Sequence, residues 1–376
     1  MESKTQSQQK EAVVLEGEAW SKLRFGGIEE GSLILCDRSC PDAPDALRYR
    51  EGNDFEVDYQ KGWIRRLPGS TIPDFRENSS FGAEPRSVNL EKIADFGPWH
   101  CQKYTVYAFY EFDPSGNDTY GDIIRQISGD GSPALPLGLA EGIRKKKPLI
   151  YGVIGDSIST GCEASEGNDF FSLFADYMKA LGAADVKIYN TAVGGTTSQD
   201  AAAAVERLYG EQAVQPDLIT VGYGMNDMCS LGNDPGTGPE EYISHIRQAL
   251  ERIRSLAVND PVVILITSMP ANPIWNYTSG GSTALAEALR RFAVQEGLPL
   301  ADVNRLFHSE LEHGKQYQEL IISLINHPGD YGHHLYFLML KELLDRAVFT
   351  LGAPGSSSSS TCESIHYKHI YKEEKE

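Results

Sequence analysis

The stretch YGVIGDSISTG, residues 151–161, decides the fold. It completes an apolar run from Leu149 to Ile154, which is typical of a short buried strand, and Gly155 ends that strand. A helix can begin a few residues later, so we expect Ser157 at the carboxyl end of a central strand. Open α/β sheets bind their ligands at that edge, and a helix N-terminus there favours developing negative charge. Ser157 is therefore a candidate nucleophile, and the alternative is an ordinary strand–turn–helix junction with a serine cap.

Residues 148–350 alternate between apolar strands and amphipathic helices. The strands are expected to begin at Leu149, Val186, Leu218, Val262 and Leu298. Helical spacing covers 169–181, 198–209, 240–256, 283–296 and 334–349. Strand–helix alternation with short connections predicts a five-stranded parallel sheet with helices on both faces.

The region before this domain has a different pattern. Residues 1–12 are polar and are expected to form a flexible N-terminus. Residues 13–144 show short alternating runs and turns, including a hairpin over 54–67, and predict an all-β, jelly-roll-like sandwich. The basic run 144–148 is expected to be a solvated linker, and the serine-rich segment 351–376 a flexible tail.

Composition excludes several classes of function. The net charge of −19 would repel phosphate backbones, so a nucleic acid is not an expected partner. No apolar run is long enough to span a membrane, and no secretory signal is visible in the sequence as given, which predicts a cytoplasmic protein, or a secreted one if a signal was removed. The six cysteines contain no CxxC pair, so a zinc site is not expected, and without a visible secretory signal we expect free thiols. The sequence leaves the oligomeric state open, and a homo-oligomer is one of the alternatives.

Polar residues at the expected strand ends supply what acyl transfer requires. Ser157 is a hydroxyl nucleophile, and His327 is a side chain whose usual pKa suits a general base near neutrality. The backbone N–H groups of Ser157 and Gly194 and the side-chain amide of Asn226 are candidate donors to a tetrahedral oxyanion. His333 and His334 are rivals of His327, but His333 is expected to begin the last helix.

Four sequence blocks in this order resemble the SGNH hydrolases, also called GDSL esterases. The blocks are Gly155-Asp156-Ser157, Gly194, Gly224-x-Asn226-Asp227 and His327-Pro328. The resemblance covers residues 148–350 and implies a flavodoxin-like, three-layer α/β/α domain that hydrolyses esters without a metal or an organic cofactor. A β-sandwich before such a domain is similar to the arrangement in carbohydrate acetylesterases. Asp156 and Asp227 are then expected to shape the loops around the site.

One position departs from that family's pattern. The family usually has an aspartate three residues before the catalytic histidine, and this chain has Leu324 there. The site would therefore work as a Ser–His dyad, or another group would orient the imidazole. The candidates are a main-chain carbonyl near Leu324, the side chain of Asn326, Asp302 and Asp330.

The loop after the fourth strand contains two aromatic residues, Trp275 and Tyr277, that could line a substrate pocket. A packed loop is the alternative for both. Taken together, the residues and the resemblance favour a serine esterase that removes acetyl groups from a small-molecule or oligosaccharide ester. The alternatives are a glycan-binding protein that has lost activity, and an esterase, thioesterase or lipase with a non-sugar substrate.

Overall fold

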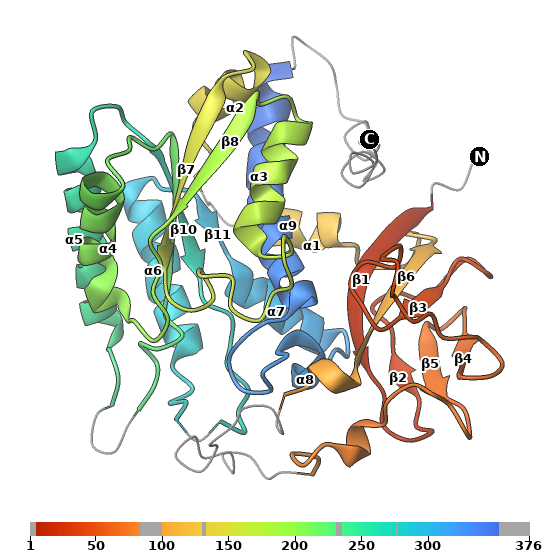
Figure 1. Ribbon diagram of the computed structural model, residues 1–376. Helices are drawn as coiled ribbons and strands as arrows, with labels where there is room; N and C mark the ends of the chain where they lie inside the picture. The colour runs from red at the N-terminus through yellow and green to blue at the C-terminus, as the bar shows by residue number, and fades with distance from the viewer. Residues whose placement is uncertain (1–4, 83–99, 130–132, 231–234, 276, 353–376) are drawn as a thin grey trace.

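The computed structural model describes residues 5–82, 100–129, 133–230, 235–275 and 277–352 (Figure 1). The larger part of the chain forms an α/β domain, and the N-terminal part forms a β domain beside it. Within these ranges no helix combines the length and the apolar composition that crossing a membrane requires.

The α/β domain is built on the predicted five-stranded parallel sheet. Its strands are β7 (Pro148–Gly155), β8 (Asp185–Asn190), β9 (Leu218–Tyr223), β10 (Val262–Thr267) and β11 (Leu300–Ala301). They lie in the order β11-β10-β9-β7-β8, so β7 is an interior strand between β8 and β9. This is the flavodoxin-like order, and it confirms the predicted fold class. The strand order reverses beside β7, so the loop after β7 lies at the point where such sheets bind ligands.

Helices cover both faces of this sheet, as Figure 1 shows. One face is covered by α4 (Ala201–Glu206), α5 (Pro239–Leu256) and α6 (Ser282–Glu296), with short turns at η4 (Ser198–Asp200) and η5 (Arg207–Glu211). The other face is covered by α3 (Phe170–Ala180) and the long α9 (Asp330–Gly352), with α2 (Leu137–Arg144) packed against α9. The apolar strands between these layers form the main core.

The β domain is a sandwich of two three-stranded antiparallel sheets. One contains β1 (Gln6–Val14), β6 (Thr105–Phe112) and β3 (Ile34–Cys36), in the order β1-β6-β3. The other contains β2 (Ser21–Lys22), β5 (Trp63–Arg66) and β4 (Phe55–Asp58), and includes the predicted hairpin. Turns η1 (Phe75–Glu77) and η3 (Gln102–Tyr104) flank the sheets.

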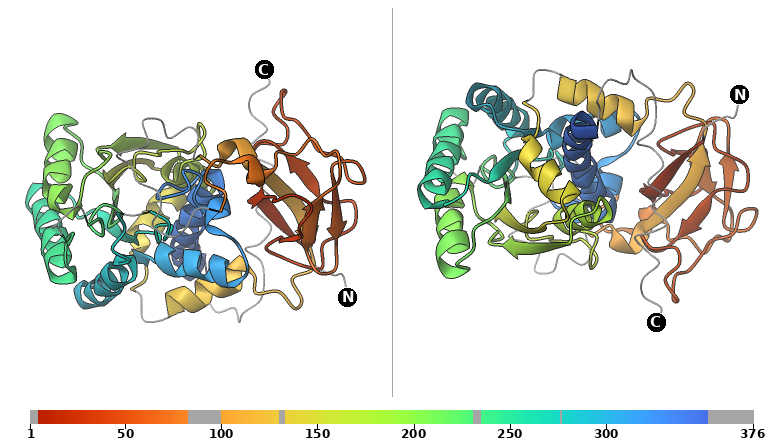
Figure 2. Two further views of the ribbon diagram at one scale, coloured as in Figure 1. Left: turned by 90° about the horizontal axis from the view of Figure 1, so that it is seen from below. Right: turned by 90° about the horizontal axis from the view of Figure 1, so that it is seen from above.

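Strand β6 connects the two domains through the alternation of its side chains. Val106, Ala108 and Tyr110 face the core of the sandwich, whereas Tyr107 and Phe109 pack with the core of the α/β domain. All these residues are buried, so the first sheet of the sandwich is covered on both faces. Both views in Figure 2 place the sandwich on the side of α9, away from α5.

Buried ion pairs also join the domains. The ammonium group of Lys315, which is fully buried, donates to Glu11 at 2.9 Å and to the Ala12 carbonyl at 2.7 Å on β1. Arg24 of the β domain donates to Glu310 of α7 (Val303–Glu312) at 2.8 Å. A buried charge that loses its partner is strongly destabilising, so these pairs penalise separation of the domains.

Two sequence predictions of local structure were wrong. Residues 120–144 are not strands and turns but contain α1 (Tyr120–Gly129) and α2, whose apolar faces pack on the α/β domain. Residues 6–12 are not flexible, because β1 starts at Gln6 and pairs with β6. The segment after β11 contains two helices, α7 and α8 (Tyr317–Leu320). The predicted tail lies outside the described residues beyond Gly352.

Candidate active site

The loop that carries Ser157 is shaped by Gly155 at the end of β7. A Cβ atom at Gly155 would lie 2.2 Å from the Ser159 hydroxyl and 2.3 Å from the Gly222 carbonyl, so no larger residue fits there. Asp156 turns the chain by accepting a hydrogen bond of 3.0 Å from the backbone N–H of Ile158. Ser157 is thereby placed at the carboxyl edge of the sheet with 7% of its surface exposed.

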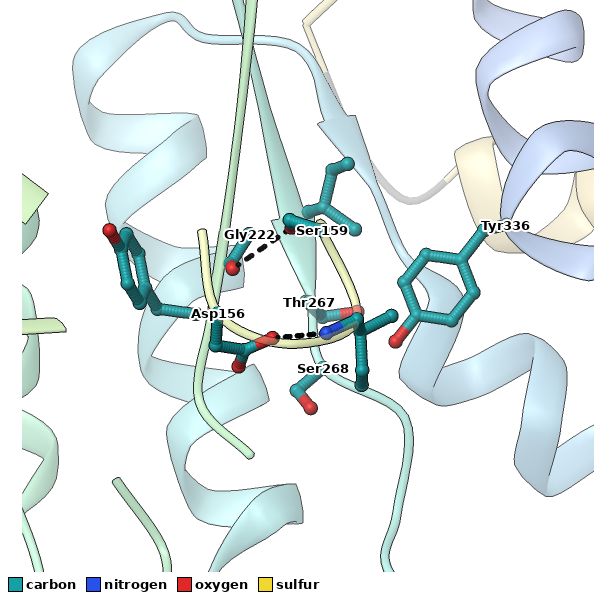
Figure 3. A pocket seen from close by; sticks show the side chains of 9 residues that line it. Asp156, Ser159, Gly222, Thr267, Ser268 and Tyr336 are labelled. Atoms are coloured by element: carbon teal, nitrogen blue, oxygen red, sulfur yellow. Dashed lines mark hydrogen bonds between the residues drawn. The ribbon is translucent and has the colours of Figure 1, made fainter. Parts of the chain in front are cut away.

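Behind this loop lies a small cavity, drawn in Figure 3. Its wall includes Asp156, Ser159, Thr267 and Tyr336 but not Ser157, and its volume of about 10 Å³ is room for one water molecule. Burial, together with the charge of nearby Asp227, raises the pKa of Asp156 to about 7. The hydrogen bond of Asp156 to the Ile158 N–H gives this side chain a structural part in the turn, and the cavity behind the turn does not include Ser157.

The structure brings Ser157 and His327 together, although 170 positions separate them in the chain. Ser157 Oγ and His327 Nε2 are 2.8 Å apart, which is the geometry of a nucleophile and its base. The hydroxyl of Ser323 fixes the histidine loop by accepting from the N–H groups of Asn326 at 3.2 Å and His327 at 2.8 Å. Burial lowers the pKa of His327 to about 4, so the imidazole is neutral near pH 7 and can accept a proton.

The predicted oxyanion donors lie on loops that surround Ser157. A Cβ atom at Gly194 would lie 3.7 Å from Ser157 Cβ, so the two backbones approach closely. One N–H of the Asn226 amide donates to the Thr196 carbonyl at 2.8 Å, which ties the Asn226 loop to the Gly194 loop and leaves the second N–H for a ligand. Asp227 strengthens this connection by accepting from the backbone N–H of Ser198 at 3.0 Å.

The other ring nitrogen of His327 faces a short loop after the nucleophile. Its Nδ1 is 3.7 Å from Cys162 Sγ, and a carboxylate oxygen of Glu163 belongs to the same cluster, whose ligand atoms lie within 4.8 Å of one another. Glu163 is also 2.8 Å from His100 Nε2, so the β domain contributes a side chain to this site. Burial raises the pKa of the Cys162 thiol, which therefore keeps its proton and is a weak metal ligand.

None of the four groups suggested from the sequence to orient His327 has a described hydrogen bond to its ring. Asp302 begins α7 and pairs with Arg290 at 2.6 Å, and Asp330 accepts from Ser165 N at 2.7 Å. The Leu324 carbonyl accepts from the Asn272 amide at 2.7 Å. The buried Asn326 Oδ1 has no partner within the described part of the chain.

The two aromatic candidates for the substrate pocket differ in exposure. Trp275 is 3% exposed and belongs to the main core, so the alternative of a packed loop holds for it and it presents no open face to a sugar. Tyr277 is partly buried, and its ring meets that of Trp275 edge to face, with centroids 6.4 Å apart. Of the two alternatives for Trp275, its burial favours the packed loop.

The family comparison covers this same set of loops. Residues 153–335, which include Ser157, Gly194, Asn226 and His327, match the family model described as GDSL-like lipase/acylhydrolase. This part of the chain is a GDSL-like hydrolase domain. No curated protein matches the sequence.

Solved structures similar to this GDSL-like protein have low sequence identity. A lipolytic G-D-S-L family protein from Veillonella parvula is 16% identical, with 52% of this chain and 98% of that chain covered and a TM-score of 0.43. A two-domain esterase active on acetylated mannans is 18% identical, with 61% and 58% covered and a TM-score of 0.46. A catalytic mutant of an acetylxylan esterase from Geobacillus stearothermophilus is 17% identical, with 52% and 94% covered and a TM-score of 0.42.

Sequence reasoning missed Glu163 and His100 as neighbours of the GDSL-like site. Glu163 lies six residues after Ser157, in the same loop, and could have been suspected for that reason. Nothing in the sequence around His100 points to the site, because His100 arrives there only through the docking of the β domain.

Proposed function

We propose that this protein is a serine esterase that removes acetyl groups from carbohydrates. The observation that carries the esterase proposal is the 2.8 Å contact between Ser157 Oγ and His327 Nε2, beside the donors at Gly194 and Asn226. A hydroxyl nucleophile, a neutral base and convergent N–H donors are together the requirements of acyl transfer.

The reaction follows from this geometry. Ser157 Oγ attacks the ester carbonyl while His327 Nε2 takes the hydroxyl proton. The carbonyl oxygen becomes an oxyanion that accepts hydrogen bonds from the Ser157 and Gly194 N–H groups and the Asn226 amide. The C–O bond to the alcohol then breaks, and His327 returns its proton to the leaving oxygen. Water, deprotonated by His327, attacks the acyl-serine in the same way and releases the acid.

Two features support a short acyl group on a neutral alcohol. Ser157 is only 7% exposed, and Gly194 approaches it closely, so space beside the nucleophile is narrow. The net charge of −19 disfavours polyanionic substrates. The carbohydrate part of the proposal rests on the resemblance drawn from the sequence, in which a β-sandwich precedes the hydrolase domain.

Hydrolysis of 4-nitrophenyl acetate, butyrate and octanoate tests this proposal, followed by acetate release from acetylated oligosaccharides. We expect kcat/KM to be highest for acetate and to fall at least about tenfold by octanoate, because a longer chain does not fit the narrow space. A preference for octanoate would contradict the deacetylase proposal and indicate a lipid substrate. The absence of activity on all esters would favour the glycan-binding alternative.

The pH dependence of the reaction follows from the ionisation of His327. Only the neutral imidazole accepts the serine proton, and burial lowers its pKa to about 4. We therefore expect kcat/KM for a short ester to rise as pH increases through about 4 and to be level towards neutrality. Circular dichroism at each pH would confirm that the fold is intact. An acidic limb at the usual histidine value of about 6.5 would show that burial does not perturb this imidazole.

A further inference from the structure

The imidazole of a catalytic histidine needs a group that fixes its orientation and stabilises its positive charge. In this chain the position of the usual aspartate is occupied by Leu324, whose side chain is 4% exposed. Leu324 belongs to an apolar cluster that we call the docking cluster. Its members are Val14, Phe75, Cys101, Tyr104, Ile322 and Leu324. Four of these residues come from the β domain, so Leu324 serves the domain interface and not the imidazole.

A carboxylate from another part of the chain lies beside the ring instead. Glu163 contributes an oxygen to the cluster within 4.8 Å that includes His327 and Cys162. Its backbone has φ of +68°, a conformation that costs free energy for a residue other than glycine. Backbone strain of this kind persists only where surrounding contacts stabilise it. Here the strained conformation places the Glu163 carboxylate next to His327.

The β domain holds Glu163 in that place. His100 Nε2 is 2.8 Å from Glu163 Oε2, and the side chains of the two residues are 14% and 28% exposed. The segment after His100 is fixed to the histidine loop, because Cys101 N donates to the Ile322 carbonyl at 2.7 Å. The docking cluster therefore positions His100, and His100 positions Glu163.

We propose that Glu163, held by His100 of the β domain, is the positioning residue that orients His327 and stabilises its protonated form during catalysis. This inference rests on the proposed esterase function. It assigns to the β domain a direct part in the active site, since removal of His100 would release the carboxylate.

The charges around the ring agree with this assignment. The hydrogen bond with His100 lowers the pKa of Glu163, so its carboxylate is ionised when the imidazole receives a proton. Its negative charge raises the pKa of His327, whereas burial, His333 and His100 lower it. The thiol of Cys162 keeps its proton, and a neutral thiol is a weaker acceptor than a carboxylate.

The substitution Glu163→Gln keeps the shape and removes the charge. We expect kcat for 4-nitrophenyl acetate to fall about 10- to 100-fold with little change in KM, less than the loss of about 10⁴ seen when a directly bonded triad aspartate is neutralised. The acidic limb of the pH profile should also move to lower pH, because a charge that raises the pKa of His327 is gone. The matched control is Glu166→Gln, an exposed carboxylate in the same loop, which should leave kcat and the limb unchanged.

Two further measurements separate positioning from mere structural support. Formate should partly restore the activity of Glu163→Ala by replacing the missing carboxylate, which it would not do if Glu163 only stabilised the loop. The effects of His100→Gln and Glu163→Gln should be much less than additive in the double variant, since both remove the same function.

Cys162→Ala tests the other group beside His327 Nδ1. This variant should retain kcat within about threefold, because the Cys162 thiol is a weak acceptor.

Failure of this inference can be told apart from failure of the proposed function. An active wild type, with Glu163→Gln within about twofold of its kcat and no change in the pH limb, would overturn the role of Glu163 and leave the esterase intact. A wild type that hydrolyses no ester would overturn both.

Discussion

Replacing Ser157 by alanine is expected to reduce the kcat of ester hydrolysis by roughly 10⁴-fold or more. In the proposed mechanism the substitution removes the atom that forms the acyl bond, and leaves Gly194 and Asn226 to bind the substrate carbonyl. KM should therefore change much less than kcat. Steady-state hydrolysis of 4-nitrophenyl acetate at neutral pH measures both quantities.

The control for Ser157→Ala is Ser159→Ala, two positions further along the same loop. The Ser159 hydroxyl donates to the Gly222 carbonyl at 3.4 Å (Figure 3), whereas the hydroxyl beside His327 Nε2 is that of Ser157. We expect this variant to keep its activity within a few-fold. A wild-type rate in Ser157→Ala would assign the hydrolysis to another group and refute the site described above.

Restoring the usual aspartate by Leu324→Asp is expected to damage the protein and not to improve its activity. The side chain at 324 lies among Val14, Phe75 and Tyr104, and the docking cluster contains no cation to pair with a buried carboxylate. The loss of a buried leucine and the cost of a buried carboxyl together should lower the free energy of unfolding by about 3 kcal/mol or more. Urea denaturation monitored by tryptophan fluorescence measures this change.

Leu324→Met is the volume-conserving control, and it should cost less than about 1.5 kcal/mol. Activity in Leu324→Asp should fall as well, since the docking cluster also positions His100. A variant that is as stable as the wild type and more active would show that residue 324 can face His327, and would remove the reason for assigning that role to Glu163.

The architecture of the α/β domain could be predicted because each element carries its own local signal. Strands such as Val262–Thr267 are uniformly apolar, and helices such as Pro239–Leu256 are strongly amphipathic. The helices α1 and α2 were missed because each spans only ten or eight residues, and such short segments resemble strands bounded by turns. Both helices are amphipathic, but helices this short depend on the packing of their apolar faces on the α/β domain for stability.

The residues of the candidate site that follow a strand or precede a helix could also be predicted from the sequence. Ser157, Gly194, Asn226 and His327 stand at strand ends or before a helix, and parallel strands bring these positions to one edge of the sheet. The group that we propose to orient His327 follows no such rule. Glu163 and His100 meet because two domains dock, and the sequence separation of 63 residues between them gives no signal of that contact.

The measurement that tests the central claim most directly is the mass of the enzyme during turnover. Mixing the protein with 4-nitrophenyl acetate, quenching with acid within milliseconds and analysing the digest by mass spectrometry would locate any covalent intermediate. We predict one acetyl group on the peptide that contains Ser157, and no acetylation of that peptide in Ser157→Ala. Turnover with the acetyl group on Cys162 or another residue, or with no acetyl-enzyme at all, would contradict the assignment of Ser157 as the nucleophile.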